Sequence, residues 1–213
     1  MDARDLLAVR TGLLAGGVAV ARVTQPYRVA GRRFPAPAPQ LDAAWIAVIG
    51  WLRERPEFAH VPMIAAGRSS GARVACRTAA AVGAAGVVAL AFPLHPPGRP
   101  KRSRAQELVE VRLPVLVVQG ERDPFGAPAE FPPSADVREI PGVDHGFAVA
   151  RQAPITQAEA LQLVASTVCQ WLRALLGSPG GNRRPDVTVG HAQTIRAHSA
   201  DQEVTHHHAA GPR

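Results

Sequence analysis

A serine flanked by glycines follows a short apolar run and precedes a helical stretch. Residues 67–71 are Gly-Arg-Ser-Ser-Gly, after the apolar residues 61–66 and before the Ala- and Val-rich residues 72–82. This pattern is typical of a nucleophile elbow, in which Ser69 projects above the edge of a sheet. The glycines permit a sharp turn because they lack a Cβ, and the helix N-terminus favours the negative charge that develops when an ester or amide is attacked.

A serine hydroxyl needs a base within hydrogen-bond reach, and the base needs an orienting acid. In this kind of site the expected chain order is serine, acid, histidine, each on a loop after a strand. Asp123 follows the apolar run at 114–119, and His145 follows the run at 137–140. The sequence therefore predicts that Ser69 attacks, His145 carries the proton and Asp123 fixes the tautomer of the imidazole.

Each of these residues also has a structural interpretation. Ser69 could cap a helix, Asp123 could shape a turn, and His145 could be a surface histidine. Their order, each after a predicted strand, favours the catalytic interpretation. Glu121 is the alternative acid, whereas Asp144 adjoins His145 too closely to orient it easily.

Further residues near these motifs are candidates for the same site. The backbone N–H of Ser70 is predicted to bind the oxyanion. Arg68 could hold an anionic group of a substrate or point away from it. His95 lies in a loop after a predicted strand and could line a pocket, although a lone loop histidine is more often structural or solvated.

Helical and strand-like segments alternate along the chain. Apolar residues at helical spacing predict helices, and short apolar runs between turn signals predict strands. We expect helices at 3–15, 41–52, 72–82 and 161–175, and strands at 18–23, 61–66, 86–92, 114–119 and 137–140. Strands that are apolar throughout predict a mostly parallel sheet covered by helices on both faces.

The length of 213 residues fits one domain and a tail. We expect the domain at 1–176 and a disordered low-complexity tail at 177–213, which is rich in Gly, Pro, Arg and His and lacks apolar periodicity. The tract His206–His208 could bind a metal, but a solvated end is the favoured interpretation. We predict no metal site and no organic cofactor.

The charge and cysteine content restrict the partners. Lys101 is the only lysine, so 23 of the 24 basic residues are arginine, and the formal net charge is +7. Nucleic acid is not expected, because aromatic residues are only 5% and do not interleave with arginines. Asp2 and Asp5 are unlike a signal peptide, and no apolar run could span a membrane. With Cys76 and Cys169 as buried thiols, we expect a cytoplasmic protein.

Four segments together resemble a group of small bacterial α/β-hydrolases, related to the hydrolase-like domain of the NSL histone-acetyltransferase complex subunit 3 family. The resemblance covers about residues 1–176. It implies a three-layer α/β-hydrolase fold without a large lid, and Ser69, Asp123 and His145 as the triad. Some relatives are scaffold subunits, so the fold alone does not imply turnover. The segments are 67–75, 92–98, 119–126 and 144–147.

The chain departs from this family at its start. Members begin with a strand that ends in a His-Gly-x-Gly-like loop, which supplies a second oxyanion N–H. Here the chain begins at Met1, immediately downstream of that position. We therefore expect a sheet without its N-terminal strands, and a native protein that extends upstream. Loss of one oxyanion donor costs roughly a hundred- to a thousand-fold in turnover.

The sequence thus predicts a serine hydrolase that cleaves a small ester, thioester or amide through an acyl-enzyme. The alternative is a non-catalytic member of the same fold that serves as an interaction or scaffold protein. The sequence does not favour any oligomeric state.

Overall fold

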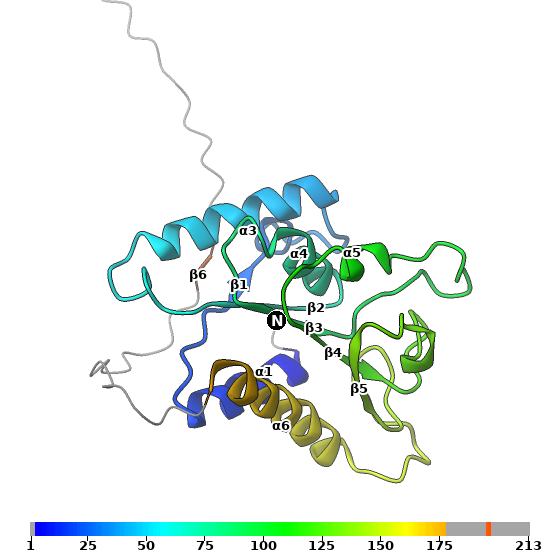
Figure 1. Ribbon diagram of the computed structural model, residues 1–213. Helices are drawn as coiled ribbons and strands as arrows, with labels where there is room; N and C mark the ends of the chain where they lie inside the picture. Colours follow the sequence, from blue (N-terminus) through cyan, green and yellow to red (C-terminus); the bar gives the residue numbers. More distant parts are fainter. Residues whose placement is uncertain (1–2, 178–194, 197–213) are drawn as a thin grey trace, which may run out of the picture.

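The computed structural model describes residues 3–177 and 195–196. Its centre is a four-stranded sheet in the order β2-β3-β4-β5, with every neighbouring pair parallel (Figure 1). The expected parallel sheet is therefore confirmed. Its strands are β2 (Ile64–Arg68), β3 (Gly86–Leu90), β4 (Val115–Gly120) and β5 (Asp136–Ile140).

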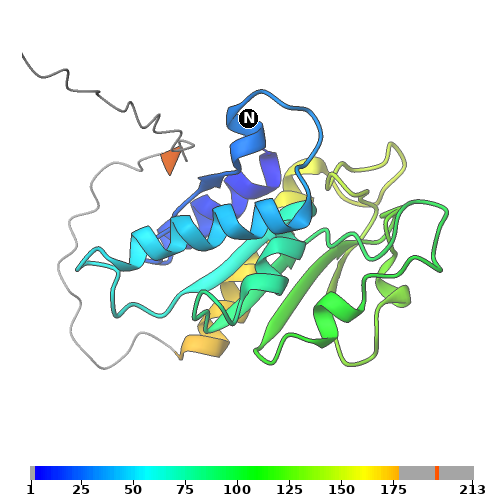
Figure 2. The same cartoon turned by 90° about the horizontal axis from the view of Figure 1, so that it is seen from above.

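Helices cover both faces of this sheet. One layer contains α1 (Arg4–Ala15) and α6 (Gln157–Leu176), and the opposite layer contains α3 (Ala38–Arg53), α4 (Ser70–Thr78) and the short α5 (Gln106–Val109) (Figures 1 and 2). The described residues also form the short helix α2 (Pro26–Val29) and a 3₁₀ turn, η1 (Pro128–Glu130). This is the three-layer arrangement that continuous apolar strands predict.

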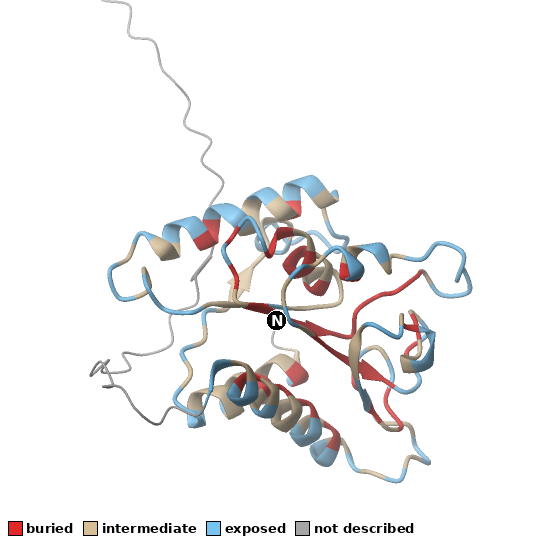
Figure 3. Ribbon diagram, in the orientation of Figure 1, coloured by how far each residue is buried: buried red, intermediate tan, exposed pale blue. Residues whose placement is uncertain are grey.

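The core consists of two apolar layers, one on each side of the central strands. Every residue of β3 is buried, as are all but the first of β4 (Figure 3). Val87 and Val117 pack on the side of α4, whereas Val88 and Leu116 pack on the side of α6. Because the two central strands are held from both faces, the loops at their carboxyl ends have a rigid base.

The expected buried strand at residues 18–23 is wrong. Residues 18–22 have no strand partner among the described residues and are exposed or half-buried. Only Val23–Thr24 forms a strand, β1, which pairs in parallel with β6 (Ile195–Arg196) in a separate two-stranded sheet. An apolar run forms a strand only where a neighbour accepts and donates its backbone hydrogen bonds, and the sequence of the run does not show whether one is present.

The end of the chain is described only in part. Most of the expected tail at 177–213, including His206–His208, lies outside the described residues. In the part that the structure describes, no helix is both long and apolar enough to cross a bilayer.

Candidate functional site

Ser69 occupies the turn between β2 and α4 with φ 53° and ψ −117°. A positive φ is unfavourable for a residue with a Cβ, so the surrounding structure must impose it. The Ser69 side chain makes no cap hydrogen bond to α4. Its Oγ lies 2.8 Å from Nε2 of His145 instead, so the hydroxyl points toward the histidine loop and not back into its own helix.

The tight turn depends on Gly67 more than on Gly71. A Cβ on Gly67 would lie 2.6 Å from the backbone nitrogen of Ala72 and closer still to the carbonyl of Gly71, whereas a Cβ on Gly71 would meet nothing within 4 Å. The expectation that the glycines permit the sharp turn therefore applies to Gly67, whereas Gly71 lies in open space. The close approach of β2 to the first turn of α4 requires a glycine at position 67.

His145 connects Ser69 to a buried carboxylate. Nδ1 of His145 lies 2.8 Å from Oδ2 of Asp123, and Asp123 is 3% exposed. The other carboxylate oxygen accepts the backbone N–H of Phe125 at 2.8 Å. Because an ionised carboxylate only accepts hydrogen bonds, the imidazole proton lies on Nδ1, and Nε2 is left to accept the Ser69 hydroxyl proton.

The sequence interpretation missed Gln119, the last side chain of β4 before Gly120. Gln119 is fully buried, and its Nε2 lies 2.8 Å from Oδ2 of Asp123, 2.9 Å from the carbonyl of Gly126 and 3.3 Å from that of Phe92. Three acceptors around one nitrogen fix the orientation of the amide. The available signal was a polar residue that ends an otherwise apolar strand one residue before a turn.

Phe125 of the acid loop contacts both the histidine loop and the loop after β3. The ring of Phe125 packs against that of His145, with centroids 4.3 Å apart. The backbone N–H of His95 donates to the carbonyl of Phe125 at 2.9 Å. The loop after β3 is thereby joined to the acid loop.

Both ring nitrogens of His95 are hydrogen-bonded within the protein. Nδ1 lies 3.0 Å from the carbonyl of Pro96, and Nε2 lies 2.9 Å from a carboxylate oxygen of Glu130. Both partners are acceptors, so together they favour the protonated form of the ring. The carbonyl of Pro96, together with Glu130, raises the pKa of His95 above its ordinary value. His95 therefore has no ring nitrogen available to a ligand.

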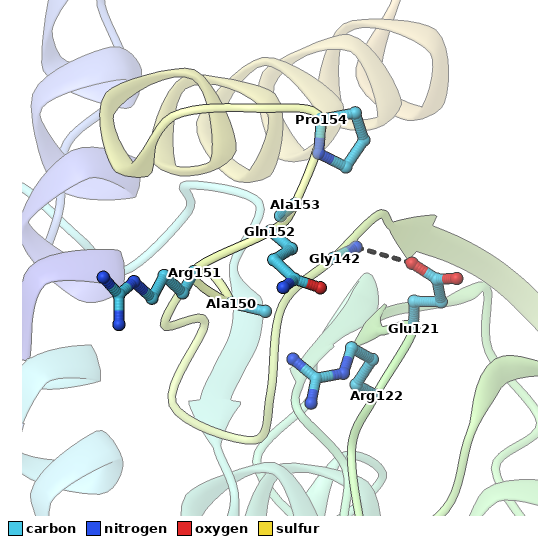
Figure 4. A pocket seen from close by; sticks show the side chains of 8 residues that line it. All are labelled: Glu121, Arg122, Gly142, Ala150, Arg151, Gln152, Ala153 and Pro154. Atoms are coloured by element: carbon cyan, nitrogen blue, oxygen red, sulfur yellow. Dashed lines mark hydrogen bonds between the residues drawn. The ribbon is translucent and has the colours of Figure 1, made fainter.

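The alternative acids are engaged elsewhere. Glu121 accepts the backbone N–H of Gly142 at 2.6 Å, and Oδ1 of Asp144 accepts those of Gly146 and Ala148. Glu121 also lines a hollow of about 460 Å³ (Figure 4). The other lining residues are Arg122, Gly142, Ala150, Arg151, Gln152, Ala153 and Pro154, and none of Ser69, Asp123 and His145 belongs to this hollow.

The two residues beside Ser69 differ in what they offer to a ligand. Ser70 is the first residue of α4, where a backbone N–H has no acceptor within the helix, so its N–H is available beside the Ser69 hydroxyl. Arg68 has Nε 2.9 Å from a carboxylate oxygen of Asp5 and donates from Nη2 to the carbonyl of His145 at 3.0 Å. Its guanidinium is thus already paired with the protein.

The arrangement can support nucleophilic acyl transfer. It contains a hydroxyl hydrogen-bonded to an imidazole, a buried carboxylate on the far nitrogen of that imidazole, and a backbone N–H at the start of a helix. These are the groups needed to activate a serine and to bind the oxyanion that follows attack.

Comparisons with known proteins bear on the fold that positions this site. Residues 1–173 match the model of the alpha/beta hydrolase domain family. A serine hydrolase without a lid from Xanthomonas campestris is 20% identical, with a TM-score of 0.56 over 80% of this chain and 75% of that one. An alpha-beta serine hydrolase homologue from Coxiella burnetii is 14% identical, with a TM-score of 0.54 over 79% and 77%. The esterase domain of a Rhodothermus marinus protein is 14% identical, with a TM-score of 0.55 over 81% and 80%.

At these identities the solved structures establish the shared fold, whereas the family model covers most of the chain. The expectation of an α/β-hydrolase is confirmed, and the chain belongs to the alpha/beta hydrolase domain family.

Proposed function

We propose that this protein is a serine hydrolase that cleaves a small ester, thioester or amide through an acyl-enzyme. The observation that carries the proposal is the continuous chain of hydrogen bonds from Ser69 through His145 to Asp123, with both links at 2.8 Å. The family membership supports the same class of chemistry.

In the first half of the reaction, Oγ of Ser69 attacks the carbonyl carbon of the substrate while Nε2 of His145 takes the hydroxyl proton. The carbonyl π electrons move to the oxygen, and the backbone N–H of Ser70 donates to it. His145 then returns its proton to the leaving alcohol, thiol or amine as the bond to the carbonyl carbon breaks, and the acyl group stays on Ser69.

In the second half, a water molecule takes the place of the leaving group. His145 accepts a proton from the water, the hydroxide adds to the acyl carbon, and the Ser69 oxygen leaves with the proton from His145. Asp123 keeps the Nδ1 proton in place and stabilises the imidazolium in both halves. None of these steps needs a metal or an organic cofactor.

Three narrower assignments are also proposals. We propose a small-molecule substrate, a cytoplasmic location and a relationship to the NSL complex subunit 3 family, the last on the four motifs at 67–75, 92–98, 119–126 and 144–147. A scaffold role on the same fold is the competing proposal. It has no need of the Ser69–His145 hydrogen bond.

Hydrolysis of p-nitrophenyl esters of increasing acyl length tests the proposal. Ser69→Ala should lower kcat by at least about 10⁴-fold, because a triad without its nucleophile retains only oxyanion and binding effects. Ser134→Ala, at an exposed serine before β5, is the control and should behave as wild type. Hydrolysis that is equal in wild type and Ser69→Ala would refute the proposal, and a folded protein without any hydrolysis would favour the scaffold role.

A further inference from the structure

Arg68 connects three elements that meet beside Ser69. It ends β2, its Nε lies 2.9 Å from Oδ2 of Asp5 on α1, and its Nη2 donates to the backbone carbonyl of His145 at 3.0 Å. Asp5 is 2% exposed and Arg68 is half-buried. A buried carboxylate and a guanidinium thus lie between the first helix and the loop of the histidine.

The other contacts of the histidine loop lead away from β2. The backbone N–H of Arg122 in the acid loop donates to the carbonyl of Val143, and Gln157 of α6 donates to the carbonyl of Phe147 at 2.8 Å. Oδ1 of Asp144 accepts two N–H groups of its own loop, those of Gly146 and Ala148. Among the residues that the structure describes, Arg68 makes the hydrogen bond that joins this loop to the strand before the nucleophile, in addition to the bond between Ser69 and His145.

The Asp5–Arg68 contact is chiefly electrostatic. The two atoms are 2.9 Å apart, but neither Asp5 Oδ2 nor Arg68 Nε has an aligned hydrogen-bond partner. Burial raises the pKa of Asp5, while Arg68 and, more weakly, His145 act in the opposite direction. The Asp5 carboxylate is therefore close enough to interact electrostatically with Arg68 and with His145.

We propose that Asp5 and Arg68 are a positioning pair for His145, an inference that rests on the proposed hydrolase function. Arg68 holds the backbone of His145 at the distance from Ser69 that proton transfer requires. Asp5 neutralises Arg68, so that the guanidinium does not oppose the positive charge that forms on the imidazole during attack. In this role Arg68 is not available to bind an anionic substrate group.

The charged groups around His145 come from separate elements. Asp123 contacts the imidazole from the acid loop, Arg68 of β2 contacts the backbone carbonyl of His145, Asp5 of α1 pairs with Arg68, and Asp144 belongs to the same loop as His145. Removing the Asp5 charge alone leaves one uncompensated positive charge. Removing the charges of both Asp5 and Arg68 restores the balance but not the hydrogen bond to His145.

Four variants of the full chain and one control separate charge from position, with kcat, KM and the pH profile of kcat/KM as readouts. Arg68→Met should lower kcat by about 10- to 100-fold with little change in KM, because small misplacements of a reacting group have effects of this size. Arg68→Lys should recover part of the loss. Arg138→Met, at an exposed arginine of β5, is the control and should match wild type.

The pH profile distinguishes this role from a merely structural one. Asp5→Asn should move the acidic limb of the profile to lower pH by about half a unit or more, because the unopposed guanidinium disfavours protonation of the imidazole. In Asp5→Asn combined with Arg68→Met, the limb should return to the wild-type position while kcat stays low.

The possible failures are distinct. If the wild-type protein neither hydrolyses esters nor reacts at Ser69, the proposed function fails and this inference falls with it. If the wild type is active but Arg68→Met matches it, or Asp5→Asn is folded by circular dichroism and shows no shift of the limb, only the positioning pair is refuted. Should Arg68→Met not fold, Asp5→Asn and Arg68→Lys still decide the question.

Discussion

At the scale of single residues, the site depends on the buried carboxylate of Asp123 and on the groups that donate hydrogen bonds to it. Asp123 accepts from Gln119, Phe125 and His145. A carboxylate held by several donors keeps one orientation. Changes to these donors should therefore affect both stability and proton transfer.

Gln119 offers a direct test of this dependence. Gln119→Leu keeps the approximate volume but removes the buried donor to Asp123 and leaves the carbonyl of Gly126 without this partner. We expect a loss of about 1–3 kcal/mol in the free energy of unfolding, measured by urea denaturation, together with a lower kcat. Gln106→Leu, at an exposed position of α5, should change stability by less than about 0.5 kcal/mol. Equal effects of the two substitutions would contradict the role of Gln119.

Protonation of His95 should make a pH-dependent contribution to the stability of the folded protein. Its pKa is raised above the ordinary 6.5, so the folded protein binds this proton more tightly than the unfolded chain. The stabilisation is fully present below pH 6.5 and is lost as the pH rises through the folded-state value. Because Glu130 is partly exposed, we expect this stabilisation of the folded protein to be less than about 1 kcal/mol.

The measurement is the free energy of unfolding of wild type and His95→Asn at about pH 6 and about pH 8.5. The difference between the two proteins should be larger at the lower pH. A difference that grows toward alkaline pH would show that the ring is neutral when the protein is folded at pH 6.

At the scale of elements, the two glycines of the elbow make a matched pair. Gly67→Ala places a Cβ 2.6 Å from the backbone nitrogen of Ala72, so β2 and α4 must separate. We expect a loss of about 3 kcal/mol or more in the free energy of unfolding, or failure to fold. Gly71→Ala meets nothing within 4 Å inside a helix and should be neutral or stabilising by about 0.5–1 kcal/mol. Similar thermal unfolding of the two variants would refute the close packing at Gly67.

The elements that position the site could be predicted because their signals are local. The apolar runs of β3 and β4 and the glycine-flanked turn at 67–71 each identify an element from a few neighbouring residues. The expected strand at 18–23 failed because strand formation also needs a partner distant in the chain. The same limit applies to β1, whose pairing with β6 has no signal in its own residues.

At the scale of the whole molecule, the free energy of unfolding should depend on the helical layers that pack on the two faces of the sheet. Leu172 on α6 is 5% exposed and packs in the same apolar layer as Val88 and Leu116, whereas Leu176 on the same helix is 47% exposed. Leu172→Ala should lower the free energy of unfolding by about 2–5 kcal/mol. Leu176→Ala should change it by less than about 0.5 kcal/mol. Equal losses in chemical denaturation would show that α6 does not cover the sheet as described.

The candidate site was predictable to the extent that it follows the order of chemical groups along the chain. Ser69, Asp123 and His145 were identified because each follows an apolar strand, and the carboxyl ends of parallel strands meet at one edge of a sheet. The supporting contacts of Gln119 and Asp5 depend on side-chain packing between elements. No spacing in the sequence specifies such packing, so these roles could be inferred only from coordinates.

The most direct test of the account is to find the residue that reacts with a fluorophosphonate probe. The wild-type protein should gain the mass of one phosphonyl group, and tandem mass spectrometry should locate the adduct on Ser69. Ser69→Ala should remain unlabelled, while Ser134→Ala should label at the wild-type rate. An adduct on another residue, or labelling that persists in Ser69→Ala, would contradict the assignment of Ser69 as the nucleophile.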